Sequence, residues 1–185
     1  NLIIEVGHES VDFTIVASGQ NSASPHHEPG ETVIKKGDVL VIDIGGTTPS
    51  GYCSDSTRTY VIGECSPDFQ SKYEILKQAQ ELSIQAVSNQ IAAEQLDAVA
   101  RDHLGKNDLA EYFIHRTGHG IGMETHEEPY IVLGNKIQIK DGNAFSIEPG
   151  FYIEGKYGAR IEDIVIKTGG KSVNCNNTTK DLVSI

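Results

Sequence analysis

Apolar residues form short stretches near both ends of the chain, and in the middle they recur with a helical period. Short apolar or β-branched stretches bounded by polar and glycine-containing segments are typical of β-strands. The sequence therefore predicts strands over residues 14–17, 39–44, 59–62, 144–147, 150–153, 161–167 and 182–185. The polar segment over residues 18–30 is expected to be a loop.

The middle of the chain predicts two helices. After Pro67 and Asp68, apolar residues recur at helical spacing, at Tyr73, Leu76, Ala79, Leu82 and Ala86. A second helix is predicted over residues 93–104, with Leu96, Val99 and Ala100 facing inward. Strands, then helices, then strands predict an α+β fold, with helices against one face of a mainly antiparallel sheet. No linker or repeat divides the sequence, so residues 1–185 are predicted to form a single domain.

Composition narrows the class of protein. The chain has 185 residues, of which 38% are hydrophobic and 22% charged, as is ordinary for a globular protein. Its formal net charge of −11 argues against a nucleic-acid partner, which would call for a stripe of Lys and Arg. Apolar runs such as Val39–Ile42 are far shorter than the ~20 residues of a membrane span. Cys53, Cys65 and Cys175 are odd in number and form no CxxC motif, which favours reduced thiols and a cytoplasmic location.

Two aspartates are the first candidates for chemistry. Asp43 lies within an apolar, β-branched strand, where an isolated carboxylate is costly unless it is paired or bound to a cation. Asp55 follows twelve residues later, a spacing that suits a hairpin bringing both carboxylates together. A solvent-facing Asp43, and a turn Asp55 or its pairing with Arg58, are the alternative interpretations.

Histidines mark two further segments. Gly118 and Gly120 flank His119, which allows close backbone packing and leaves the imidazole accessible. His126 follows in Thr125-His126-Glu127-Glu128, which is not the HExxH motif of zincins. His26 and its neighbour His27 lie in a Pro-rich loop, where a surface role and a catalytic role are both open.

The remaining candidates lie near the C-terminal strands. Glu148 ends an apolar strand, Arg160 and Glu162 are predicted to share one strand face, and Asp163 the other. Each glutamate alone could be a simple ion-paired group. Four carboxylates and one imidazole together, at Asp43, Asp55, His119, Glu148 and Glu162, suit two divalent ions with bridging carboxylates.

The segments that carry these residues resemble a known family. IDIG, GYCSDSTRT, HRTGHGIG, THEEPY, SIEPG and ARIED are similar to motifs of the metallopeptidases that comprise Xaa-Pro dipeptidases (prolidases), Xaa-Pro aminopeptidases and methionine aminopeptidases. The resemblance runs from about Val11 to Ile166, with the motifs in family order. It implies the pita-bread fold, two pseudo-symmetric halves around a dinuclear centre.

The resemblance also implies roles for individual residues. Asp43, Asp55, His119, Glu148 and Glu162 would be metal ligands, with Asp55 and Glu162 bridging both ions. The ions would be Mn²⁺ or Co²⁺ in the first place, with Zn²⁺ or Fe²⁺ as alternatives. A metal-activated hydroxide would attack the peptide carbonyl. His26 and His126 would contact the substrate, His126 would donate to the oxyanion, and Glu148 would shuttle the proton.

Three features resemble the Xaa-Pro branch more than methionine aminopeptidases. Arg160 lies two residues before Glu162, as in the GxRxED pattern, and would either bind a substrate carboxylate or brace the site acids. A purely structural pair with Asp163 or with a glutamate is the alternative. The other two are the SGxN…PHHEP loop and the GYCSDSTRTYVIG and FIHRTGHGIG segments. The expected substrate is a peptide or dipeptide with proline in second position; methionine aminopeptidase activity and an inactive binding module are the alternatives.

The resemblance covers only part of what such a family member carries. An N-terminal domain and the first elements of the catalytic domain are expected to precede this segment. The resemblance does not decide whether the protein forms a homodimer.

Overall fold

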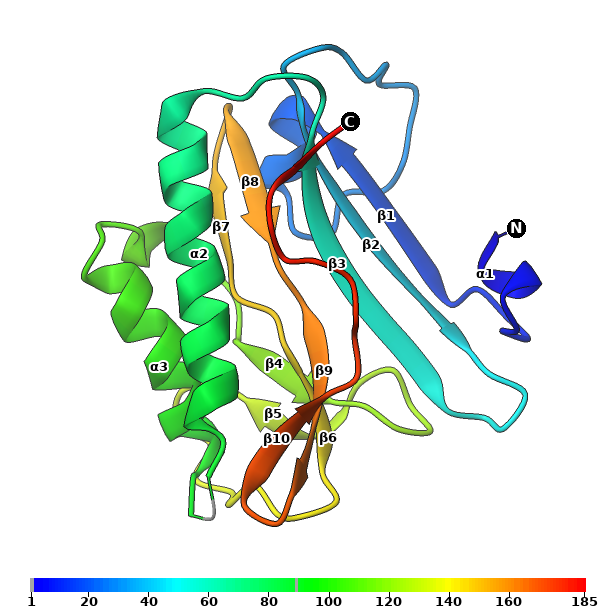
Figure 1. Cartoon of the computed structure of the whole chain (residues 1–185), viewed down its shortest axis with the longest axis vertical. Helices are drawn as coiled ribbons and strands as arrows, with labels where there is room; N and C mark the ends of the chain where they lie inside the picture. The colour runs from blue at the N-terminus through cyan, green and yellow to red at the C-terminus, as the bar shows by residue number, and fades with distance from the viewer. Residues whose placement is uncertain (1, 89) are drawn as a thin grey trace.

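The N-terminal part of the fold is an antiparallel sheet. The structure, a computed structural model, describes residues 2–88 and 90–185. A short helix α1 (Leu2–Glu5) precedes strand β1 (Phe13–Ser18) and the 3-10 turn η1 (Gly19–Ala23). Strands β2 (Val39–Thr47) and β3 (Cys53–Val61) form a hairpin, and β1 pairs with β2 on its other edge. Figure 1 shows these long strands on the side of the molecule away from the main helices.

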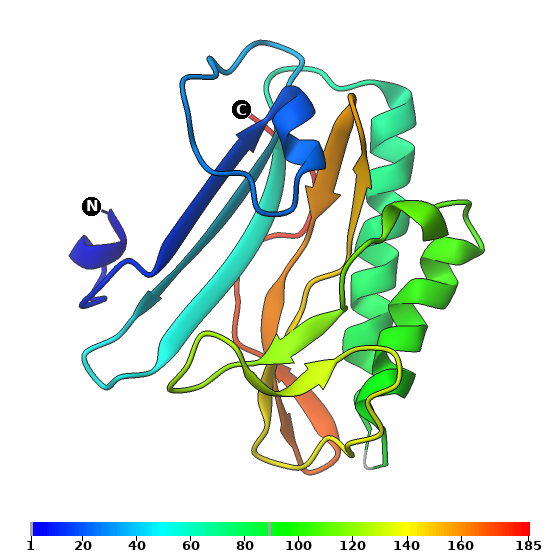
Figure 2. The ribbon, with the colours of Figure 1, turned by 180° about the vertical axis from the view of Figure 1, so that it is seen from behind.

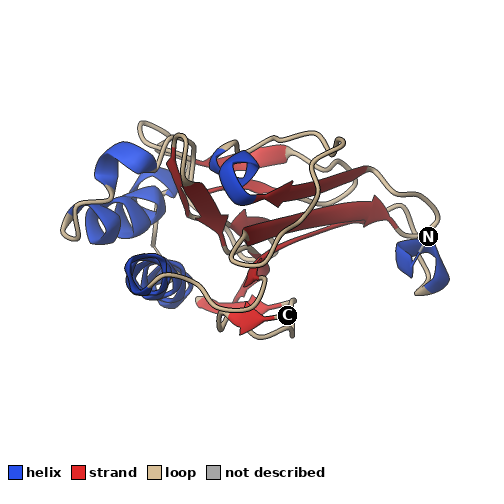
Figure 3. Cartoon of the chain, turned by 90° about the horizontal axis from the view of Figure 1, so that it is seen from above, coloured by secondary structure: helices blue, strands red, loops and turns tan. Residues whose placement is uncertain are grey.

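Two helices follow and cover the strands from one side. Helix α2 (Pro67–Ala86) begins where Ser66 accepts a hydrogen bond from the Phe69 backbone N–H and Pro67 occupies the first turn. Helix α3 (Ala93–Gly105) begins where the side chain of Gln95 accepts from the Ala92 N–H. Seen from above, both helices lie together beside the strands (Figure 3). A second 3-10 turn, η2 (Ala110–Tyr112), leads back to the strands.

The C-terminal part contains a five-stranded and a two-stranded sheet. The larger sheet has the order β10-β9-β6-β4-β5, and β7 pairs with β8. The strands are β4 (Gly118–Gly120), β5 (Glu127–Ile131), β6 (Ala144–Ile147), β7 (Gly150–Ile153), β8 (Tyr157–Arg160), β9 (Asp163–Thr168) and β10 (Lys171–Asn174). The last strand, β11 (Val183–Ser184), returns to the first sheet and pairs in parallel with β3. Figure 2 shows β4 and β5 between the helices and the β2–β3 hairpin.

Two hydrophobic clusters join the helices to the strands. The first packs Phe69, Tyr73 and Leu76 of α2 against Phe151 and Ile161. The second packs the end of α2 and Leu96 of α3 against β5, β6 and β9, through Ile131, Phe145, Ile147 and Val165. Both helices therefore bury one face only, as the predicted α+β arrangement requires.

The predicted elements are confirmed in kind, with corrections at several borders. Leu82 is 41% exposed, so it does not belong to the buried face of α2. Strand β3 begins six residues before the predicted 59–62, because its polar residues face inward and mask the apolar pattern. The predicted strand 161–167 begins at Asp163, so Arg160 and Glu162 are not in one strand. Strands β4, β5, β8 and β10 and helix α1 were not predicted.

Candidate metal centre

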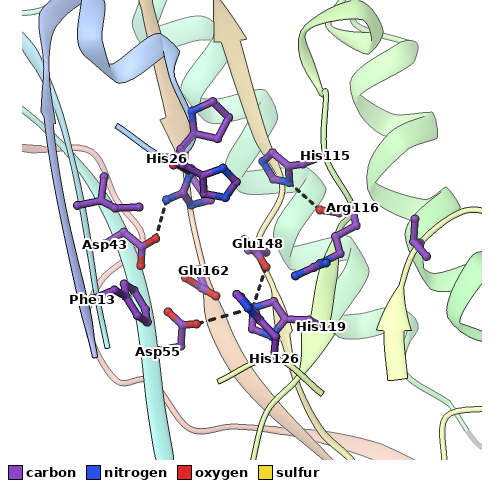
Figure 4. Close-up of a pocket in the computed structure, with 14 residues that line it drawn as sticks. Phe13, His26, Asp43, Asp55, His115, Arg116, His119, His126, Glu148 and Glu162 are labelled. Atoms are coloured by element: carbon purple, nitrogen blue, oxygen red, sulfur yellow. Dashed lines mark hydrogen bonds and ion pairs between the residues drawn. The ribbon is translucent and has the colours of Figure 1, made fainter. Parts of the chain in front are cut away.

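A cavity of about 570 Å³ lies between the β2–β3 hairpin and the C-terminal strands, and it gathers the predicted site residues. Figure 4 shows their side chains converging from both parts of the fold. All eight predicted residues line it: His26, Asp43, Asp55, His119, His126, Glu148, Arg160 and Glu162. His27 is not among the residues that line this cavity.

The hairpin register brings Asp43 and Asp55 onto one face. Asp43 lies opposite Thr57, and Asp55 lies opposite Gly45, so the two aspartates are diagonal neighbours. Both are buried, which excludes the solvent-facing Asp43 and the exposed turn Asp55. Arg58 pairs with Asp163, which excludes its pairing with Asp55. The predicted meeting of the two carboxylates in a hairpin is therefore confirmed.

His119 is held between the strands by close backbone contacts. A Cβ atom added at Gly118 would come within 1.9 Å of the Ser146 carbonyl oxygen, and one at Gly120 within 2.4 Å of the Glu128 carbonyl oxygen. The two glycines are therefore needed for this packing, as predicted. The Nδ1–H of His119 donates to the Gly120 carbonyl at 3.0 Å, so Nε2 faces the acids.

Glu148 and Glu162 complete the ring of acids. His119 Nε2 lies 3.2 Å from Glu148 Oε1 and 3.7 Å from Asp55 Oδ2 (Figure 4). Glu162 lies in the link between β8 and β9, where its Oε2 accepts a hydrogen bond from Thr57 Oγ1 at 2.7 Å. One potential ligand atom from each of Asp55, His119 and Glu162 lies within 4.8 Å of the others, so these three can contact a common ion.

Arg160 is buried beside Asp43 and braces it. Its Nη2 donates to Asp43 Oδ2 at 2.7 Å, while Nη1 donates to Tyr152 Oη at 2.8 Å and to the Pro25 carbonyl at 3.2 Å. Its Nε donates to Thr57 Oγ1 at 3.1 Å. Of the roles considered for this residue, these contacts support the bracing of a site acid, and they exclude a simple pair with Asp163.

The acids are short of positive partners. Burial and then the charges of Asp43 and Glu148 raise the pKa of Asp55 to about 8. Burial and then Asp55 and Glu148 raise the pKa of Glu162 well above its ordinary value. Burial also raises the pKa of Asp43, although Arg160 opposes it. Buried carboxylates that repel one another in this way favour a cation between them.

The pKa of Glu148 is shifted in the opposite direction. Burial works to raise its pKa, but the hydrogen bond and charge of His119 lower it to about 2. Its Oε1 also accepts a hydrogen bond from Ser146 Oγ at 3.0 Å. Glu148 is therefore ionised at neutral pH.

Orphaned oxygen atoms provide an independent test of whether metal fits. Oδ1 of Asp43, Oδ1 of Asp55 and Oε1 of Glu162 are buried and have no hydrogen-bond partner among the described residues. An unpaired buried carboxylate oxygen is costly, and a divalent ion would satisfy several at once. The oxygen-rich donor set with one imidazole nitrogen fits a hard or borderline divalent metal.

Several cavity residues were not identified from the sequence. The apolar residues Phe13, Ile15 and Val132 line the cavity, as do His115 and Arg116. His115 Nε2 lies 2.9 Å from Tyr152 Oη, which joins it to Arg160. His115 stood within the HRTGHGIG motif, but a lone histidine four residues before another carries no signal of its contacts.

Comparison with known proteins identifies relatives of this chain. The chain is 51% identical over 183 residues to the probable dipeptidase PepE of Mycobacterium tuberculosis, covering 99% of this chain and 49% of that protein. It is 46% identical over 179 residues to the Xaa-Pro dipeptidase of Lactobacillus helveticus, covering 96% and 48%. The chain thus spans about half the length of these curated relatives.

Solved structures support the same relationship. The crystal structure of the dipeptidase PepE from Mycobacterium ulcerans matches with a TM-score of 0.97 at 51% identity, over 98% of this chain and 49% of that one. A recombinant prolidase from Thermococcus sibiricus matches with a TM-score of 0.95 at 49% identity, over 98% and 49%. The pita-bread fold is therefore confirmed. The profile of Metallopeptidase family M24 matches residues 2–168, and the chain belongs to this family of metal-dependent peptidases.

Proposed function

We propose that this chain carries the catalytic site of a dinuclear-metal exopeptidase that hydrolyses the bond between an N-terminal residue and proline. The observation that carries the proposal is the buried cluster of Asp55, His119 and Glu162, whose ligand atoms lie within 4.8 Å of one another. Buried carboxylates whose charges lack positive partners destabilise a fold, whereas two divalent ions would neutralise them. The similarity to Xaa-Pro dipeptidases supports the choice of substrate.

Five residues would hold the ions. We assign Asp55 and Glu162 to both ions, Asp43 to one, and His119 and Glu148 to the other. The orphaned oxygens of Asp43, Asp55 and Glu162 support this assignment, as does the orientation of His119 Nε2. Mn²⁺ and Co²⁺ suit so oxygen-rich a set, and Zn²⁺ and Fe²⁺ are alternatives. Such ions lower the pKa of water toward neutrality and polarise a carbonyl.

The remaining residues would handle the substrate and its proton. Glu148, ionised at neutral pH, would take the proton of the attacking water and pass it to the leaving nitrogen. Burial and the neighbouring His119 lower the pKa of His126, so its neutral ring can donate a hydrogen bond to the developing oxyanion without a repelling charge. The rings of His119 and His126 meet edge-on, with centroids 4.1 Å apart.

His26 and Arg160 would bind the substrate from the opposite wall. His26 is exposed at the cavity and reaches it from the Pro-rich loop (Figure 4). Arg160 fixes that loop by donating to the Pro25 carbonyl, and its Nη2 carries a second N–H for a substrate carboxylate. Phe13, Ile15 and Val132 offer apolar contact to the side chain of the N-terminal residue.

Within residues 2–88 and 90–185, no helix combines the length and apolar character that a membrane crossing requires. Cys53, Cys65 and Cys175 are free thiols, which fit a reducing compartment. We therefore assign the protein to the cytoplasm.

A substrate panel tests the proposal. The intact protein, loaded with Mn²⁺ or with Co²⁺, is assayed on Xaa-Pro dipeptides, Xaa-Pro tripeptides and a Met-Ala peptide. We expect turnover of Xaa-Pro substrates only, and its loss in Glu148→Gln and Asp55→Asn. Activity on Met-Ala alone would favour a methionine aminopeptidase. No turnover at full metal occupancy would favour a binding module.

A further inference from the structure

Behind the metal centre, on the other face of β3, lies a buried arginine. Alternation along a strand directs Asp55 and Thr57 toward the cavity and Arg58 away from it. Arg58 is only 6% exposed. It lies three residues from Asp55 and is not among the residues that line the cavity, so any effect on the centre must pass through its contacts.

Every N–H of the Arg58 guanidinium has an acceptor. Nη1 donates to the carbonyl of Thr57 at 2.8 Å and to that of Glu162 at 2.6 Å. Nη2 donates to Asp163 Oδ1 at 2.6 Å and to the Thr178 carbonyl at 3.0 Å. Nε donates to the Thr179 carbonyl at 2.9 Å. A guanidinium has five N–H donors in a rigid fork, and all of them are used here.

Arg58 contacts the backbone of Glu162, a residue that lies outside the β-strands. Glu162 lies in the link between β8 and β9, outside both strands. Its backbone N–H donates to the Thr57 carbonyl at 3.1 Å, and its carbonyl accepts from Arg58. Both backbone polar groups of Glu162 are therefore hydrogen-bonded to β3, the strand that carries Asp55. The spacing between the two acids depends on these ties.

The C-terminal strap, which we define as residues 175–185, supplies the rest of the anchorage. It runs beside β3 in Figure 1 and pairs with it through β11. Asn176 Nδ2 donates to the Asp55 carbonyl at 3.1 Å, and its Oδ1 accepts from the Ile164 N–H at 2.7 Å. The strap therefore touches the backbone of one site acid directly, and that of Glu162 through Arg58.

We propose that Arg58, held by the C-terminal strap, is a positioning residue that sets Glu162 opposite Asp55 and so determines the metal affinity of the centre. This inference rests on the proposed function, because it presumes that these acids hold the ions. Partners that orient metal ligands typically change affinity on the order of 10- to 100-fold when they are removed. In this proposal Arg58 is such a partner, and it acts on Glu162 through the backbone carbonyl of that residue.

Metal titration of the intact protein tests the proposal. Mn²⁺ binding is followed by electron paramagnetic resonance and calorimetry in wild type, Arg58→Lys, Arg58→Gln and Asn176→Ala. Arg58→Lys keeps the charge beside Asp163 but cannot serve five acceptors, so we expect about a 10-fold loss of affinity. Arg58→Gln should lose about 100-fold, and Asn176→Ala, which leaves Arg58 in place, a few-fold. Turnover of Arg58→Lys should return at saturating Mn²⁺, as expected for a positioning role.

Leu104→Ala is the matched control. Leu104 is fully buried in the first hydrophobic cluster, away from the cavity, so its truncation lowers the melting temperature without touching the centre. Its Mn²⁺ affinity should equal that of wild type. Unchanged affinity in Arg58→Lys and Asn176→Ala, or an equal loss in Leu104→Ala, would overturn the inference. A wild type that binds none of Mn²⁺, Co²⁺, Zn²⁺ and Fe²⁺ would instead overturn the proposed function.

Discussion

Glu162 and Asp163 are adjacent in the sequence and equally buried, yet their surroundings are opposite. Glu162 is 1% exposed and Asp163 is 0% exposed. The Asp163 carboxylate accepts hydrogen bonds from Arg58 and Asn174 and lies 2.9 Å from Lys180 Nζ. The Glu162 carboxylate accepts one from Thr57, and its other oxygen has no partner within the described part of the chain.

The pKa values of the two acids follow this difference. Burial raises the pKa of both, but hydrogen bonds from Lys180 and Arg58 outweigh it at Asp163, whose pKa is lowered. At Glu162, burial acts together with the charges of Asp55, Glu148 and Asp43, so the pKa is raised. Burial alone therefore does not distinguish a structural acid from a candidate metal ligand, and the compensating charges must also be counted.

The largest expected effect comes from Glu162→Gln. The substitution keeps the shape and the hydrogen bond from Thr57 but removes a charge that we assign to both ions. We expect turnover of an Xaa-Pro dipeptide to fall by about 10³-fold or more, with the fold retained. Steady-state kinetics at saturating Mn²⁺, with circular dichroism as the control for folding, measure it. Turnover within tenfold of wild type would contradict the assigned ligand role.

Asp163→Asn should act on stability. It leaves Arg58 and Lys180 with buried or partly buried charges and no carboxylate partner. Removing one member of a buried ion pair costs about 3–5 kcal/mol, so the free energy of unfolding should fall by that amount. Urea denaturation of the metal-free protein measures the change. A loss below about 1 kcal/mol would show that Asp163 is not structurally required.

Metal binding should stabilise the protein through the uncompensated cluster. At a free Mn²⁺ concentration of about 100 times the dissociation constant, one site adds about 2.7 kcal/mol to the free energy of unfolding. We expect a rise in melting temperature in wild type and in Leu104→Ala, and a smaller one in Glu162→Gln. Scanning calorimetry with and without Mn²⁺ tests this. An equal rise in Glu162→Gln would place the ions elsewhere.

The same contrast explains how far the sequence could be interpreted. Asp43 and Asp55 were predicted to meet because a hairpin fixes which side chains share a face. The early part of β3 was missed, because Asp55, Thr57 and Thr59 are polar residues that the fold buries toward the cavity and its walls. The short β4, with only Gly118, His119 and Gly120, has no apolar pattern to detect.

Contacts that depend on the strap were beyond prediction. Arg58 was considered as a partner of Asp55, three residues away, but its carboxylate partner is Asp163, 105 residues further along the chain. Leu82 follows the helical period and is nevertheless 41% exposed. Periodicity reports local structure, and it carries no information on which distant segment returns to complete a charge pair.

A further effect is expected on the pH dependence of stability without metal. The pKa of Asp55 is about 8 in the folded chain, against ~3.9 in an unfolded one. Between these values the native state binds more protons than the unfolded state, so stability should fall as pH rises from about 4 to about 8. Asp55→Asn removes this contribution, and its free energy of unfolding in EDTA should decline less between pH 5 and pH 8.

Asp163→Asn provides the matched comparison for this measurement. Because the pKa of Asp163 is lowered in the folded state, its contribution to stability is complete above the unfolded value and is lost only at lower pH. Its substitution should therefore reduce stability by a similar amount at pH 5 and at pH 8 and leave the slope unchanged. A wild-type slope in Asp55→Asn, or a flattened one in Asp163→Asn, would reverse the distinction between the two acids. The slope depends on which buried carboxylate lacks positive partners, and denaturation at two pH values is enough to identify it.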